Sequence, residues 1–313
     1  MTDDDRDAAA GLLDEAEACH DDEPERAAAL LRRIAPGTLA TERLPGLAFL
    51  LNHVLGEKLG AWAEAWSMFT PLLDAAGPRP LPVLHRQAAA AAGLSGDAAA
   101  AQRHAEALAG ATGASAELAR DVIALTQAMY RAPGQPAPEA AQIVAAALAP
   151  LREARWSAGA TPLDAAAAAC MNNVASGLIE RPAVQLTQHA PLRNAAGEAA
   201  ALAERQWLRA GNWVQHERAA YLRALVANAL GEAAQARGHA LRALAMLDAN
   251  DSAGAENVDR AFLLLEQSRA CRMLGSGDEA AAALASADAL AAQFGDAGLD
   301  AWYASRRAVS AGA

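Results

Sequence analysis

Arginine and aromatic side chains gather in one stretch of the sequence, RQWLRAGNWVQHERAAY, residues 205–221. Aromatic residues make up only 4% of the chain, so this local enrichment is distinctive. Guanidinium groups bind carboxylates through paired hydrogen bonds, which makes an anion-binding surface one interpretation. The other interpretation is structural. Asn212 and Gln215 form a capping-box pattern, which predicts a helix corner into which Trp207 and Trp213 pack.

Arginines also recur at one phase of two predicted helices. Counting back from the glycine turns after these helices predicts a set of residues that face a common concave groove: Arg218, Tyr221, Leu225, Asn228, Phe262, Leu265, Arg269 and Arg272. A groove lined by arginines and aromatic rings in an acidic protein suits an acidic peptide or a C-terminal carboxylate. Arginines that are simply solvated on helix surfaces are the alternative.

Two adjacent asparagines, Asn172 and Asn173, lie inside the apolar segment CMNNVASG. Asparagine is a poor residue for the middle of a helix, so a hydrogen-bond partner is expected for these amides. The partner is either another part of the protein or the backbone of a bound peptide.

Metal-binding and catalytic motifs give no positive signal. The seven histidines contain neither HxxxH nor HExxH, and the adjacent Cys19 and His20 would need ligands from elsewhere, because neighbouring helical residues diverge by about 100°. The segment DDEPE, residues 21–25, resembles the aspartate-rich motif of terpene cyclases, but a helix that starts at Pro24 also explains it. We therefore expect no catalytic residue, no metal and no cofactor.

The overall charge restricts the partners. A formal net charge of −11 and an isoelectric point near 5.1 argue against binding to nucleic acids or to anionic membranes. The three cysteines are far apart and form no disulfide framework. With neither a secretory signal nor a bilayer-spanning segment visible, the sequence predicts a reduced, cytoplasmic compartment.

Helix breakers divide the chain at regular intervals. Alanine, the strongest helix former, dominates between them, and no segment alternates like a strand, so we expect an all-α fold. The breakers predict about fifteen helices. These helices pair as seven hairpins, with a last helix near 298–309: 5–19 with 24–35, 40–58 with 61–75, 79–93 with 97–109, 115–131 with 137–155, 162–180 with 190–210, 213–230 with 233–248, and 256–274 with 278–293.

A repeat underlies this rhythm. Copies that begin at Leu59, Leu94 and Leu230 share a Gly or Ser after the leucine, an alanine at the seventh position and a leucine at the fifteenth. A partial copy begins at Leu274. A small residue at a fixed phase lets two helices approach closely, and glycine permits a tight turn. The pattern resembles the tetratricopeptide repeat (TPR) family, most closely in the copy from Leu59.

This resemblance implies a right-handed α-solenoid of about seven antiparallel helical hairpins and a C-terminal capping helix, as one domain over residues 1–313. Residues 1–110 are closest to the TPR spacing, and 111–313 form longer hairpins. The first-helix signature of the family is largely absent, and the chaperone-binding lysine and asparagine clamp does not match the groove positions.

The resemblance favours a non-enzymatic scaffold that binds another protein or a peptide, with an acidic segment as the best fit to the groove. A sensor domain of a bacterial regulatory system that binds a small ligand is the first alternative, since longer helical repeats occur there. A non-catalytic accessory subunit of an enzyme is the second. An uncapped terminal repeat would favour a homodimer.

Overall fold

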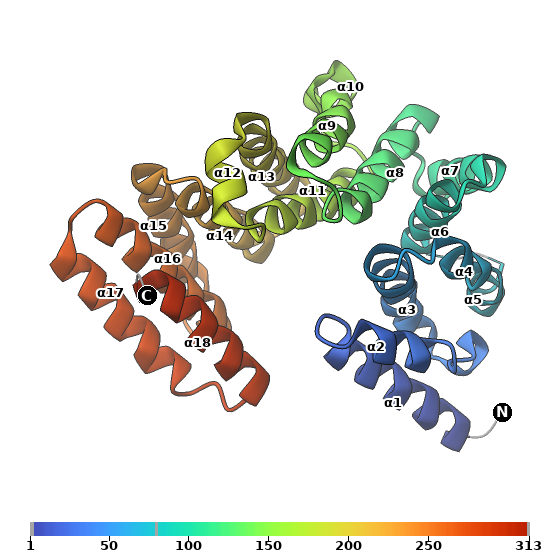
Figure 1. Cartoon of the computed structure of the whole chain (residues 1–313), viewed down its shortest axis with the longest axis horizontal. Coiled ribbons are helices and arrows are strands. Elements are labelled where there is room, and N and C mark those ends of the chain that lie inside the picture. Colours follow the sequence, from blue (N-terminus) through green and yellow to red (C-terminus); the bar gives the residue numbers. More distant parts are fainter. Residues whose placement is uncertain (1–2, 79–80, 312–313) are drawn as a thin grey trace. The chain divides into compact units, whose positions relative to one another are not determined.

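The structure is a computed structural model that describes residues 3–78 and 81–311. Its regular structure is helical, and the described residues contain no strand, which confirms the all-α prediction. The chain divides into two compact units, Met1–Ala166 and Ala167–Ala313. Figure 1 shows the first unit in blue to green and the second in yellow to red. The single domain over residues 1–313 stays a prediction.

The first unit is built from short helices around a leucine-rich core. Its α-helices are α1 (Asp3–Cys19), α2 (Pro24–Leu31), α3 (Leu44–Leu50), α4 (Trp62–Ser67), α5 (Phe69–Ala76), α6 (Pro82–Ser95), α7 (Ala98–Thr112), α8 (Ala116–Arg131), α9 (Ala137–Leu148) and α10 (Ala154–Ser157). A π-helix, η3 (Leu51–Lys58), continues α3, and 3-10 turns form η1 (Pro36–Thr38), η2 (Thr41–Arg43) and η4 (Ala149–Arg152). The helix α1 packs on α2 and α6 packs on α7, as the predicted hairpins require.

Prolines explain where the first unit departs from the predicted helices. The segment predicted over 61–75 is divided at Met68, because Pro71 cannot donate to the carbonyl of Ser67 and its ring clashes there. Pro150 likewise ends α9 before the predicted end at residue 155. The predicted start of the next helix at residue 79 lies outside the described residues, and that helix is seen from Pro82.

The second unit has longer helices that pack in sequence. They are α11 (Asp164–Ile179, which begins at the end of the first unit), α12 (Ala183–Gln188), α13 (Ala190–Ala210), α14 (Trp213–Ala229), α15 (Ala233–Asn250), α16 (Asn257–Met273), α17 (Gly277–Ala291) and α18 (Ala297–Ala311). From α13 to α17 each helix packs on the next, and α16 also packs on α14 and α18 (Figure 1). The predicted segments match all of them except α12, which was left unassigned.

The alanines that recur in the repeat are packed inside the protein, as expected of small residues that let two helices approach closely. The seventh-position residues are all buried: Ala65, Ala100, Ala236 and Ala280. The turn glycines Gly60, Gly231 and Gly275 have φ values of 69°, 80° and 79°, a left-handed region that favours glycine. Close helix approach and tight turns therefore account for the repeat.

The aromatic corner over residues 205–221 has the predicted cap. Asn212 accepts a hydrogen bond from the backbone of Val214, and the side chain of Gln215 accepts one from the backbone of Asn212. Trp213 packs against a core cluster formed by α14, α15 and α16. The structural interpretation of Trp213 is therefore confirmed.

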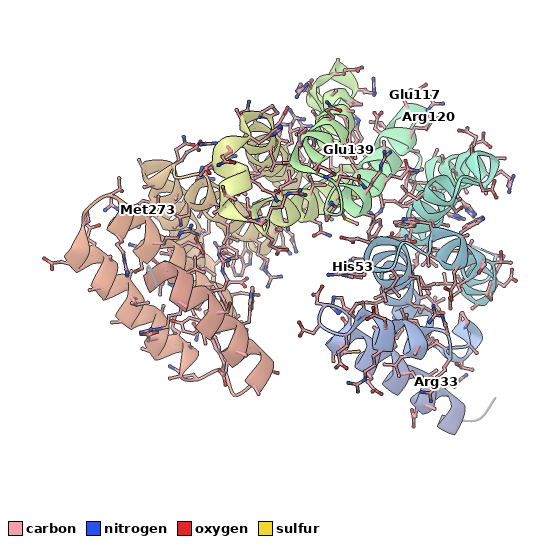
Figure 2. The ribbon with its side chains drawn as sticks, in the orientation of Figure 1. Arg33, His53, Glu117, Arg120, Glu139 and Met273 are labelled. Carbon is pink, nitrogen blue, oxygen red and sulfur yellow. The ribbon has the colours of Figure 1, made fainter. Side chains whose placement is uncertain are left out.

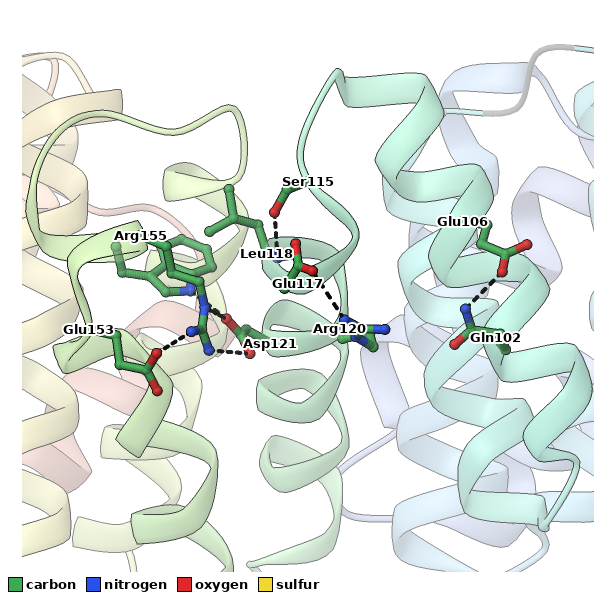
Figure 3. A network of polar contacts seen from close by, with 10 residues as sticks. Gln102, Glu106, Ser115, Glu117, Leu118, Arg120, Asp121, Glu153 and Arg155 are labelled. Carbon is green, nitrogen blue, oxygen red and sulfur yellow. Dashed lines mark hydrogen bonds and ion pairs between the residues drawn. The ribbon is translucent and has the colours of Figure 1, made fainter.

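A polar cluster holds the end of the first unit together. Figure 3 shows Asp121 on α8 facing Arg155 on α10, with a distance of 2.7 Å between Arg155 Nε and Asp121 Oδ2. Trp156 Nε1 donates to the same oxygen at 2.8 Å. Glu153 also pairs with Arg155. Since Asp121 and Trp156 are buried, this cluster fixes α10 on α8.

None of the helices in the described part of the chain is both long enough and apolar enough to cross a bilayer.

Candidate ligand-binding cavity

A cavity of about 630 Å³ opens in the second unit. Its lining residues belong to α11, α12 and the turn between them, and to α14, α16 and α18. Its walls combine apolar side chains with three arginines, and the residues are Asn172, Ser176, Ile179, Glu180, Ala183, Leu186, Arg218, Tyr221, Leu222, Leu225, Ala229, Asp259, Arg269, Trp302, Arg306 and Val309. This volume lies within the range of about 300–1,000 Å³ that is typical of ligand sites.

Helical periodicity brings these residues together. On α18, Trp302, Arg306 and Val309 are spaced i, i+4 and i+7, so they share one face. On α14, Arg218 and Tyr221 are three residues apart, so they also share one helix face. None of the described residues of α15 or α17 lines the cavity, so alternate helices supply this wall, as the predicted groove requires.

Arg218 is already paired within the protein. Its Nε donates to Asp259 Oδ2 at 2.7 Å, and its Nη2 donates to Glu256 Oε2 at 3.0 Å. The hydrogen bond with Asp259, which is stronger than the opposing effect of burial, raises the pKa of Arg218. This arginine therefore joins α14 to the start of α16. Because its charge is neutralised by Asp259 and Glu256, it adds little positive charge to the cavity wall.

Arg306 is paired with a buried carboxylate. Its Nη2 donates to Glu266 Oε1 at 2.9 Å, and the Glu266 side chain is only 2% exposed. Asn228 donates to Glu266 Oε2 at 2.8 Å and to the backbone carbonyl of Glu266 at 2.9 Å. Asn228 is buried in the contact between α14 and α16 and is not among the cavity residues. Its role in the structure is to join these two helices.

Arg269 differs from the other two arginines. It is half-buried at the cavity wall, and its guanidinium forms no hydrogen bond or ion pair with any residue that the structure describes. Burial lowers its pKa, with the positive charge of Arg306 acting in the same direction and Glu266 opposing both. The protein thus holds a cation in a partly desolvated position, and no residue in the described part of the chain is bonded to it as a counter-ion.

Tyr221 adds a second unused donor to the same cavity. Its hydroxyl has no hydrogen-bond partner among the described residues, and burial raises the pKa of the phenol, so the hydroxyl stays protonated. Arg269 and Tyr221 both line the cavity, so each has a donor that a ligand there could use. The neighbouring leucines, Leu222 and Leu225, would contact an apolar part of the same ligand.

A smaller cavity of about 280 Å³ adjoins the first and shares Asn172 and Arg218 with it. Asn173, Trp207 and Gln215 also line it. Both tryptophans of the corner are half-buried, but Trp207 lines this cavity and Trp213 packs against the core cluster of α14, α15 and α16. Of the predicted asparagines, Asn172 reaches both cavities and Asn173 reaches only the smaller one.

Three other predicted groove residues line neither cavity. Arg272 is exposed near the end of α16, whereas Phe262 and Leu265 are buried in the core. Sequence reasoning did not include Trp302 and Arg306, because it treated the last helix as a cap. Their spacing on the segment 298–309 was the available signal. Trp302 contacts Phe262 with a ring-centroid distance of 4.1 Å, which fixes α18 against α16.

The sequence matches no known protein-family model and no curated protein. The geometry of the cavity therefore carries the functional argument.

Proposed function

We propose that this protein is a non-enzymatic, TPR-like helical-repeat scaffold that binds an acidic segment of another protein in the cavity of its second unit. The observation that carries the proposal is Arg269, a half-buried cation without a bonded partner among the described residues. A carboxylate that reaches Arg269 would supply the missing counter-ion, and hydrogen bonds to charged groups contribute about 1.5–3 kcal/mol. Support for the repeat architecture comes from the buried seventh-position alanines and the glycine turns.

The size of the cavity favours the end of a chain over a long extended segment. A C-terminal residue would place its carboxylate between Arg269 and the Tyr221 hydroxyl, and its side chain against Leu222 and Leu225. The rest of the partner would leave past Trp302, which is 51% exposed at the cavity wall. Exposed tryptophans are common anchors in binding surfaces.

Selection and calorimetry test this proposal together. A displayed library of peptides with free C-termini is selected against the full chain, and the selected peptide is measured by calorimetry. We expect Arg269→Gln to weaken binding by about 10-fold or more, and amidation of the peptide terminus to have a similar effect. Arg272→Gln is the matched control, three residues along the same helix, and should leave the affinity within about twofold.

Two results would reject the proposal. One is a selected peptide whose affinity is the same for the Arg269→Gln variant and the unmodified chain. The other is a failure to select any peptide under conditions in which the protein stays helical by circular dichroism.

A second candidate follows from the volume of the cavity alone, because about 630 Å³ also suits a small acidic metabolite. In that case the protein would be a ligand sensor. A set of small dicarboxylates and phosphate esters should then raise the melting temperature with no protein partner present, and Arg269→Gln should remove that rise.

A further inference from the structure

Two histidines that are far apart in the sequence meet beside an aspartate in the first unit. His20 and Asp21 lie in the turn between α1 and α2, and His53 lies on the π-helix η3, where Figure 2 labels it. One ligand atom from each of the three side chains lies within 4.8 Å of the others. Two imidazoles and one carboxylate are a common ligand set for divalent transition metals.

The hydrogen bonds of both rings leave the same nitrogen available. His20 Nδ1 lies 2.5 Å from the backbone carbonyl of Glu17, and a carbonyl can only accept, so Nδ1 carries the proton. His53 Nδ1 donates in the same way to the carboxylate of Glu57 at 2.7 Å. When neutral, each ring then presents a lone pair on Nε2. Metal-binding histidines show this arrangement, because a bond from the second nitrogen fixes the tautomer and the ring orientation.

Both Nε2 atoms face the Asp21 carboxylate. The distance is 3.4 Å from His20 Nε2 to Oδ2 and 3.4 Å from His53 Nε2 to Oδ1. Neighbouring ligand atoms in a tetrahedral site with bonds of about 2.0–2.1 Å are about 3.4 Å apart. Both histidine–aspartate distances match this value, although they end on different oxygens of the carboxylate. The contact between His53 Nε2 and Asp21 Oδ1 is also within hydrogen-bond distance, so a proton on Nε2 competes with a metal ion for this position.

The surrounding side chains hold this geometry. Phe49 stacks on His53 with a centroid distance of 5.3 Å and an interplanar angle of 10°. The rings of His20 and His53 meet edge to face at 5.2 Å. Lys58 also belongs to this cluster, with its Nζ 2.9 Å from Asp21 Oδ1.

The Asp21 carboxylate already binds one cation, the ammonium group of Lys58. Lys58 is at the same time the competitor for the site, because its ammonium group already neutralises one oxygen of Asp21.

We infer that His20, Asp21 and His53 bind one Zn²⁺ ion in the first unit, with Glu57 as the positioning residue for His53. The mixed nitrogen and oxygen ligand set favours Zn²⁺ over Mg²⁺ or Ca²⁺, which prefer oxygen ligands alone. Three protein ligands leave a fourth tetrahedral position for water or for a group from a partner. This site is independent of the arginine cavity, since all of its residues belong to the other unit.

Metal titration of the full chain tests this inference. After treatment with a chelator and buffer exchange, the protein is titrated with Co²⁺ and followed by visible absorption, then with Zn²⁺ and followed by calorimetry. We expect one equivalent to bind, with Zn²⁺ displacing Co²⁺ and with no thermal shift in millimolar Mg²⁺. Absence of a saturable Co²⁺ spectrum and of Zn²⁺ heat would overturn the site in favour of a simple ion-pair cluster around Asp21.

Substitutions locate the bound ion. Asp21→Asn lies in an exposed turn, so it should keep the fold and remove stoichiometric binding. Glu57→Gln should weaken Zn²⁺ binding by about 10- to 100-fold. His104→Gln is the matched control, since His104 forms a histidine pair with His85 in the same unit, with 3.3 Å between their Nδ1 atoms. Binding that survives Asp21→Asn or disappears in His104→Gln would assign the metal elsewhere and overturn the inference.

A substitution that should strengthen Zn²⁺ binding distinguishes a metal site most clearly from an ion-pair cluster around Asp21. Lys58→Met removes the cation that competes for Asp21, so Zn²⁺ should bind several-fold more tightly. In an ion-pair cluster without a metal role, the same change would only remove a favourable charge contact. An unchanged or weaker Zn²⁺ affinity in a folded Lys58→Met variant would therefore count against the site.

Discussion

In the first unit, hydrogen bonds between three uncharged, buried side chains join the helices η3, α6 and α8. We call this set of side chains the neutral ladder. Asn52 on η3 donates to the backbone carbonyl of Gln87 on α6 at 3.0 Å and to its side-chain Oε1 at 2.9 Å. The hydroxyl of Tyr130 on α8 donates to the same Oε1 at 2.9 Å. All three side chains are buried. Two carboxamides and a phenol are therefore joined by hydrogen bonds without any net charge.

The second unit repeats this arrangement with charged groups. Asn228 on α14 donates to the carbonyl and the carboxylate of Glu266 on α16, and Arg306 on α18 donates to the other oxygen of that carboxylate. In both ladders the asparagine leaves its Oδ1 without a hydrogen-bond partner among the described residues. The geometry is shared, but a carboxylate replaces the glutamine and an arginine replaces the tyrosine.

The difference follows from what lies beside each ladder. The neutral ladder is closed inside its unit, where an ion would lose its hydration. The charged ladder ends at the cavity, because the Arg306 side chain lines it and is 28% exposed. Arg306 keeps part of its hydration and still pairs with Glu266. A buried charge is thus tolerated where its partner reaches solvent, and there it also supplies positive potential to a binding site.

Exchanging the chemistry of the two ladders should have the largest effect. Gln87→Glu places a carboxylate in the neutral ladder, none of whose three members is an arginine, and we expect the free energy of unfolding to fall by about 3–5 kcal/mol at pH 7. Urea denaturation at pH 7 and pH 5 measures this loss. It should shrink at pH 5, where protonation neutralises the new side chain. Equal stability of the variant and the unmodified chain at pH 7 would mean that the neutrality of the ladder is unimportant.

Glu217 tests the same idea in the second unit, because it is a buried carboxylate whose two oxygens have no hydrogen-bond partner among the described residues. Burial, and next the charge of Asp259, raise its pKa from 4.5 to about 8. Between these values the folded protein keeps a proton that the unfolded chain has lost. Stability therefore falls as the pH rises through this window, by about 1.4 kcal/mol per pH unit, and levels off above pH 8.

Glu217→Gln should remove this dependence. Relative to the unmodified chain, we expect the variant to gain about 2–4 kcal/mol between pH 5 and pH 8, measured as the change in the free energy of unfolding in urea. Parallel pH profiles for the two proteins would show that Glu217 is ionised in the folded state, against the reasoning from its burial.

Removing the third member of each ladder, Arg306 or Tyr130, should lower the free energy of unfolding by a smaller amount. Arg306→Met leaves Glu266 without its counter-ion, and we expect a loss of about 2 kcal/mol, below the full cost of a deeply buried pair because water can reach this site. Tyr130→Phe removes one neutral hydrogen bond, and we expect a loss of about 1 kcal/mol. Denaturation of both variants compares them directly, and Arg306→Met with Glu266→Gln should recover much of the first loss. Losses in the reverse order would contradict the role of charge proposed for the second ladder.

Most helix boundaries could be predicted because their signals are local. Asn212 with Gln215 marks the start of α14, and Gly231 marks its end, since a capping side chain and a left-handed glycine act within one turn. The π-helix η3 was not predicted. Its Gly56 lies directly under the ring of Trp62, where a Cβ atom would come within 2.4 Å, so its shape depends on a contact that helix propensity does not encode.

The candidate cavity was predictable only in part. The phase from Gly231 correctly brings Arg218 and Tyr221 to one wall, because spacing within a helix fixes which residues share a face. The corresponding count on α16 predicts both Arg269 and Arg272 as groove residues, but only Arg269 lines the cavity. That outcome depends on where α18 covers α16.

The sequence by itself determined the all-α class, most helix limits, the buried alanine phase and the glycine turns, since each arises from interactions between residues close along the chain. The tertiary structure alone decided which distant side chains meet. It placed Arg306 against Glu266, 40 residues away, left Arg269 unpaired among the described residues, and brought His53 to Asp21 across 32 residues. These contacts depend on how helices cross, and crossing depends on packing of the whole core, which no local pattern specifies.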